Sequence, residues 1–83
     1  MSKVGILFKI FAEDNKAEEL AQRIKENLSP KSVKTEELAF GIKTVKALFE
    51  FDDSKTSSSA IETKIRELGG VSEIEVVEES LVG

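Results

Sequence analysis

Two segments of the chain alternate between apolar positions and polar or smaller ones, which is the pattern of a β-strand. In Lys3–Ala12 the apolar positions 4, 6, 8 and 10 share one face, and in Lys43–Phe51 positions 45, 47, 49 and 51 do so. A period of two built from β-branched and aromatic residues predicts a strand in each segment. Weaker patterns predict an edge strand at Val33–Ala39, where charges discourage further pairing, and a last strand at Val71–Glu78 followed by a short tail over residues 80–83.

Two other segments carry apolar residues at the spacing of an amphipathic helix. The first, near residues 15–28, places them at i, i+3, i+4, i+7 and i+11 from Ala17. It ends before Pro30, because proline disfavours helical geometry in the residue that precedes it. The second helix is expected near residues 58–68 and ends at Gly69-Gly70, which is a strong helix stop.

Residues that commonly cap helices stand at both expected starts. Asn15 with Glu18, and Ser59 with Glu62, have the spacing of a capping box. We therefore interpret the serines at positions 57–59 as capping residues rather than as nucleophiles, which would need a base beside them.

The predicted order of elements is β-α-β-β-α-β, in one domain that spans residues 1–83. This is the split arrangement of ferredoxin-like α+β domains, a sandwich of one sheet and one helix layer. Right-handed crossovers then place both helices on one face of a four-stranded antiparallel sheet. The residues expected to be mostly buried are Val4, Ile6, Phe8, Ile10, Leu20, Ile24, Val45, Phe49, Ile61, Ile65, Leu68, Ile74 and Val76. The apolar residues expected on the open face are Leu7, Phe11, Leu48 and Val77.

Composition removes several chemistries. The chain has no Cys and no His, which excludes thiolate catalysis and the commonest nitrogen ligand for metals. Its net charge is −4, with +2 over residues 1–46 and −6 over residues 47–83, which disfavours direct binding of nucleic acid. No apolar run approaches the roughly 20 residues that span a bilayer, so we expect no membrane contact. The absence of Cys fits a cytoplasmic protein.

The acidic pair Asp52-Asp53 is the main candidate for chemistry. A magnesium site often uses one or two carboxylates, but a turn that ends a strand explains the pair better. The five glycines lack the spacing of a phosphate-binding loop. We therefore expect no cofactor, no metal and no catalytic residues, and a chain that is not an enzyme.

Phe40 lies in the expected turn between the second and third strands. Two interpretations are open on the residues alone. A large aromatic residue in a turn is often a lid on the core. The alternative is an exposed anchor for a protein partner, because aromatic anchors dominate interface energies.

The block Leu38-Ala39-Phe40-Gly41-Ile42-Lys43, with the strand and the acidic pair that follow it, resembles the guanine-nucleotide-exchange domain of the elongation factor 1-beta family, archaeal type. That family carries an apolar stretch, an aromatic residue, Gly-Ile-Lys, a strand, an acidic pair and then a helix. The helix and the last strand expected between Ile61 and Glu78 match as well. The resemblance therefore covers nearly the whole chain.

The resemblance implies a ferredoxin-like fold and a partner, the GTPase elongation factor 1-alpha. The chain would accelerate release of GDP from that GTPase, so that GTP can bind during translation elongation, and it would act as a monomer. The resemblance also implies that Phe40 inserts into an apolar pocket of the GTPase. Gly41 would let the chain turn and approach closely, and Ile42 and Lys43 complete the expected partner-binding block.

The C-terminal end departs from that family's pattern. Family members commonly carry a basic residue there, a lysine in the eukaryotic type, that reaches toward the magnesium site of the GTPase. In this chain no Lys or Arg follows Arg66. A positive charge that competes with the metal therefore cannot come from the tail.

Two other functions fit the same elements. A ferredoxin-like regulatory domain, which senses a ligand or binds a protein, would use the open sheet face, and a purely structural domain would need no partner. Exposure of Phe40 separates them from an exchange factor, because a regulatory domain has no reason to expose that side chain.

Overall fold

The computed structural model describes residues 3–82. It contains four strands, two α-helices and two single-turn 3-10 segments. In chain order these are β1 (Lys3–Ala12), η1 (Glu13–Asn15), α1 (Ala17–Leu28), β2 (Ser32–Glu37), η2 (Ala39–Gly41), β3 (Lys43–Asp52), α2 (Ser58–Glu67) and β4 (Val71–Val82).

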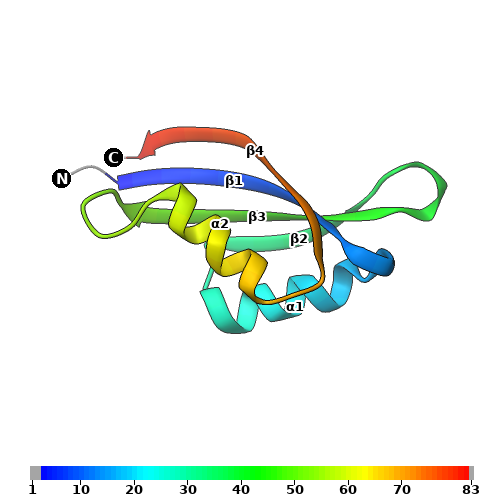
Figure 1. Ribbon diagram of the computed structural model, residues 1–83. Helices are drawn as coiled ribbons and strands as arrows, with labels where there is room; N and C mark the ends of the chain where they lie inside the picture. The colour runs from blue at the N-terminus through cyan, green and yellow to red at the C-terminus, as the bar shows by residue number, and fades with distance from the viewer. Residues whose placement is uncertain (1–2, 83) are drawn as a thin grey trace.

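The strands form one antiparallel sheet in the order β2-β3-β1-β4. Both helices cover the same face of this sheet, and the other face has no helix over it (Figure 1). The split arrangement follows from the connections, because each helix joins two strands that have one other strand between them. The predicted ferredoxin-like α+β fold is confirmed.

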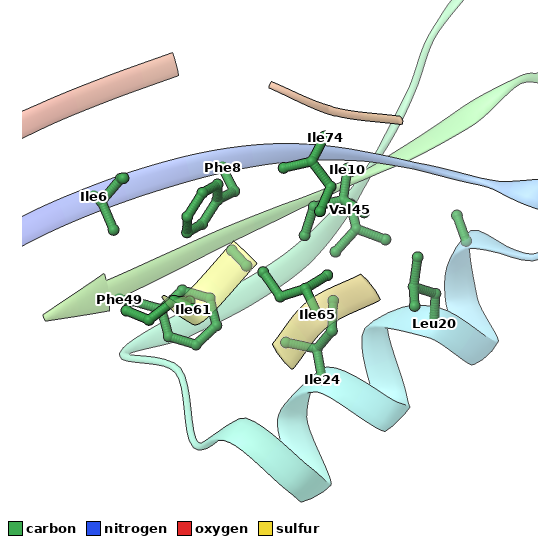
Figure 2. Close-up of a cluster of buried hydrophobic side chains, with 12 residues drawn as sticks. Ile6, Phe8, Ile10, Leu20, Ile24, Val45, Phe49, Ile61, Ile65 and Ile74 are labelled. Atoms are coloured by element: carbon green, nitrogen blue, oxygen red, sulfur yellow. The ribbon is translucent and has the colours of Figure 1, made fainter. Parts of the chain in front are cut away.

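The core lies between the sheet and the two helices, where the apolar faces of the sheet and of both helices meet (Figure 2). The Phe8 and Phe49 rings pack edge to face, with their centroids 5.9 Å apart. Ile24 of α1 and Ile65 of α2 are completely buried. Burial of a side chain of this size contributes about 1.5–3 kcal/mol, so this shared core is what holds the helices on the sheet. The predicted members that are buried are Ile6, Phe8, Ile10, Leu20, Ile24, Val45, Phe49, Ile61, Ile65 and Ile74.

The predicted burial of Val76 is wrong, because 52% of this residue is exposed. Val76 does pair with Phe8 in the register of β1 and β4. Its exposure follows from its place in β4, which is an edge strand and gives it a strand neighbour on one side only. Val4 and Leu68, also predicted as core, are partly exposed.

The last strand is longer than its sequence pattern indicates. A β-bulge falls where the partners of Leu7 and Phe8 change from Glu78 to Val76, which leaves Val77 as the extra residue. Beyond the bulge, pairing continues until Lys3 lies opposite Val82. The tail expected at residues 80–83 is therefore wrong for residues 80–82, and Gly83 lies outside the described residues.

Both predicted capping boxes are also wrong. The N-cap of α1 is Lys16, and no side chain caps that helix. The N-cap of α2 is Ser57 rather than Ser59, and its hydroxyl accepts a hydrogen bond of 3.2 Å from the N–H of Ala60. Asn15, the expected cap of α1, bonds elsewhere, as described below.

Candidate partner-binding site

The connection between β2 and β3 extends past the end of the helix layer, at the end of the sheet opposite the start of β1 and the end of β4 (Figure 1). We call its residues Leu38–Lys43 the tip. All four residues expected to bind a partner, Phe40 to Lys43, lie in it. The tip closes on itself, because Leu38 N–H donates to the Ile42 carbonyl oxygen at 2.5 Å and Ile42 N–H donates to the Ala39 carbonyl oxygen at 3.4 Å.

Phe40 points into solvent with 98% of its surface exposed. Its backbone is left-handed, with φ 63° and ψ 30°, and Gly41 follows with φ 74°. Two left-handed residues in a row reverse the chain sharply, and glycine adopts the second at no steric cost. The interpretation of Phe40 as a lid on the core is therefore wrong, and the expected exposure is confirmed.

Ile42 gives the tip a second apolar side chain, with 50% of its surface exposed. Scattered apolar residues are normal on protein surfaces. The tip differs because a fully exposed aromatic ring and a half-exposed aliphatic side chain lie two residues apart on one projecting turn. This arrangement suits insertion into an apolar pocket of another protein, which would bury both.

Lys43 is engaged within the chain. Its Nζ lies 2.5 Å from Oε1 of Glu18, in the first turn of α1. The hydrogen bond and charge of Lys43 lower the pKa of Glu18, and those of Glu18 raise the pKa of Lys43. This ammonium therefore ties the base of the tip to α1, and a partner reaches it only in competition with Glu18.

Asn15 contacts the tip from the junction between β1 and α1. Its Nδ2 donates to the Gly41 carbonyl oxygen at 3.3 Å, and its Oδ1 accepts from Lys43 N–H at 3.3 Å. The sequence pattern predicted a helix cap for Asn15 and Glu18 and gave no sign of either contact with the tip. The only signal for Asn15 and Glu18 in the sequence was their capping-type spacing. That spacing does not reveal contacts with residues 25 to 28 positions further along the chain.

The acidic pair forms the turn that ends β3. Oδ1 of Asp52 accepts from the Ser54 N–H at 3.0 Å and from the Ser54 hydroxyl at 2.7 Å. These two bonds lower the pKa of Asp52, with a smaller contribution from the charge of Lys3. The preferred interpretation of Asp52 as a turn residue therefore agrees with the structure.

A basic residue does lie beside the C-terminal end of β4. Lys3 stands opposite Val82 on one neighbouring strand and opposite Asp52 on the other. In the sequence, this positive charge is separated from Val82 by nearly the whole chain. Only the strand register shows that β1 places Lys3 beside the end of β4.

The open face is less apolar than its sequence pattern indicates. Leu7, Phe11 and Leu48 are partly buried there, and the Lys9 ammonium lies 5.5 Å from the centroid of the Phe11 ring. A shallow depression over Leu7 and Leu48 also has charged residues in its lining, namely Lys34, Lys46, Glu50 and Glu78.

Two features are absent from residues 3–82. They contain no group of three or more acidic or histidine side chains able to hold a metal ion. Neither helix in this range is long and apolar enough to cross a membrane.

The fold and the tip define a small ferredoxin-like domain that presents an aromatic side chain to solvent on a projecting turn. Residues 5–82 match the family model of the EF-1 guanine nucleotide exchange domain. The chain therefore belongs to that family, and the resemblance seen in the sequence is confirmed. Its role is guanine nucleotide exchange in translation elongation, with a GTPase elongation factor as partner. A search of curated proteins finds no individual relative that matches this chain.

Proposed function

We propose that this chain promotes exchange of GDP for GTP on elongation factor 1-alpha, and that Phe40 is its main anchor on that GTPase. The family match supports an exchange role in the EF-1 family. The single observation that carries the anchor is the 98% exposed, left-handed Phe40 on the projecting tip. An exposed aromatic residue on an ordered turn gains most of its burial energy only when a partner covers it.

Exchange follows from linkage between two binding reactions. A factor that binds the empty GTPase more tightly than the GDP-bound form must loosen GDP by the same factor. This needs differential binding but no bond-making chemistry in the factor itself. We therefore propose that the chain is not an enzyme in its own right and acts without a cofactor.

The setting of this function is also part of the proposal. Translation elongation takes place in the cytoplasm, and the resemblance is to the archaeal type of the family. The net charge of −4 supports a protein partner rather than direct contact with nucleic acid. We propose that one monomer of this chain binds one GTPase.

The test is release of fluorescent GDP from a matching elongation factor 1-alpha, with the wild type and with Phe40→Ala. Loss of an aromatic anchor costs on the order of 2–4 kcal/mol, so binding should weaken by tens- to hundreds-fold. The fold should be unchanged, because the side chain is almost fully exposed. Release that the wild type does not accelerate would contradict the exchange function, and full activity of a folded Phe40→Ala would contradict the anchor.

A regulatory, ligand-sensing domain is the other candidate function. It predicts a buried Phe40 and a binding surface on the open sheet face. The exposed Phe40, and the mixed charges around the depression over Leu7 and Leu48, favour the exchange factor.

A further inference from the structure

Asn15 uses both ends of its side-chain amide on the tip. The Nδ2 group donates to the carbonyl oxygen of Gly41, and the Oδ1 atom accepts the backbone N–H of Lys43. These two backbone groups flank Ile42, and the first of them belongs to the residue that follows Phe40. The amide therefore bridges the backbone on both sides of Ile42 and joins it to the β1–α1 junction.

The backbone at this junction suits Asn15 for that task. Asn15 has φ 54°, a left-handed conformation that asparagine tolerates better than most residues. An asparagine just before a helix usually caps it. Here no side chain caps α1, and Asn15 reaches the tip instead. The side-chain hydrogen bonds of Asn15 therefore go to the tip rather than to α1.

A second tie supports the first. The carboxylate of Glu18, in the first turn of α1, forms an ion pair with the Lys43 ammonium. About 70% of the Glu18 side chain is exposed, and ion pairs this exposed contribute little on their own. The two hydrogen bonds of Asn15 act on the backbone, so they determine the direction of the tip more directly.

We infer that Asn15 is a positioning residue for exchange, which holds the tip so that Phe40 meets the GTPase in one orientation. The inference rests on the proposed function. A tip that is already ordered loses less conformational freedom on binding, and affinity rises accordingly. Without the Asn15 bridge, the same Phe40 side chain remains, but its turn samples other directions.

The test compares Asn15→Ala with Asp14→Ala in the assay of GDP release. Both residues lie in η1 with φ 54°, so alanine meets the same backbone strain at either position. Asp14 makes no side-chain hydrogen bond to the tip among residues 3–82, which makes it the matched control. Asn15→Ala should need about three- to tenfold more protein for half-maximal release than Asp14→Ala does, as expected for loss of one or two neutral hydrogen bonds.

A double-mutant cycle with Phe40→Ala separates positioning from general stability. If Asn15 acts through Phe40, the Asn15→Ala change has little further effect in the Phe40→Ala background. Exchange of the Lys43 amide hydrogen with solvent should also be faster in Asn15→Ala than in Asp14→Ala. That readout does not depend on the GTPase.

The outcomes are distinguishable. An active wild type with equal activities for Asn15→Ala and Asp14→Ala overturns the inference and leaves the exchange function in place. Additive effects of Asn15→Ala and Phe40→Ala overturn it as well, because Asn15 then acts independently of the anchor. A wild type that does not accelerate GDP release overturns the proposed function and the positioning role that rests on it, while the Lys43 amide still shows whether Asn15 holds the tip.

Discussion

Phe40 combines a backbone conformation that lowers the stability of the folded chain with a side chain that adds none to it. A left-handed backbone is unfavourable for any residue with a Cβ atom, by roughly 1–2 kcal/mol, and its ring gains nothing from burial because 98% of it is exposed. Asparagine and glycine would adopt the same φ more easily. Natural proteins accept such local costs at functional positions, where stability and activity compete.

This competition predicts that a substitution at position 40 can stabilise the fold although binding to the GTPase is lost. Phe40→Asn should raise the free energy of unfolding by about 0.5–1 kcal/mol relative to Phe40→Ala, because asparagine tolerates φ 63° better. Both variants should bind elongation factor 1-alpha equally weakly. Urea denaturation and the GDP-release assay measure the two effects. A Phe40→Asn protein less stable than Phe40→Ala would show that the backbone is not left-handed in solution.

At the scale of elements, the strands and helices follow from the sequence far better than their contacts do. The period-two pattern of β1 and β3 and the helical spacing of α1 predict those elements because one face of each is buried in the same core. The bulge at Val77 leaves no such pattern, since a single extra residue only shifts the register. The bridge from Asn15 to Gly41 is tertiary, and no local spacing encodes it.

The difference between a covered helix and an edge strand gives a second prediction. Ile24 of α1 is completely buried, whereas Val76 of β4 is 52% exposed. Ile24→Ala should therefore cost about 2–5 kcal/mol of unfolding free energy, through lost burial and a cavity. Val76→Ala is the control and should cost less than about 1 kcal/mol. If both substitutions lower the free energy of unfolding equally, Val76 is buried in solution, and its exposure in the structure is contradicted.

At the scale of the whole molecule, the tip and the paired residues Lys3 and Val82 lie at opposite ends of a domain whose longest extent is 42 Å (Figure 1). The resemblance implies that an aromatic anchor contacts the GTPase, and members of the family commonly add a basic residue that reaches toward its magnesium site. The tip presents Phe40 to solvent for the proposed anchor contact. No Lys or Arg follows Arg66 in this chain, but the strand register brings Lys3 beside Val82 at the end of β4.

We therefore predict that Lys3 and Phe40 affect different stages of exchange. Lys3→Ala should lower the maximal rate of GDP release roughly tenfold, the order expected for one charge-assisted contact, and leave the half-maximal concentration nearly unchanged. Phe40→Ala should instead raise that concentration. Lys64→Ala, which removes an exposed lysine from α2 on the helix side, is the matched control for loss of one positive charge. If Lys3→Ala and Lys64→Ala give the same maximal rate of GDP release from the GTPase, the charge of Lys3 has no part in exchange. The tip alone must then account for the exchange activity.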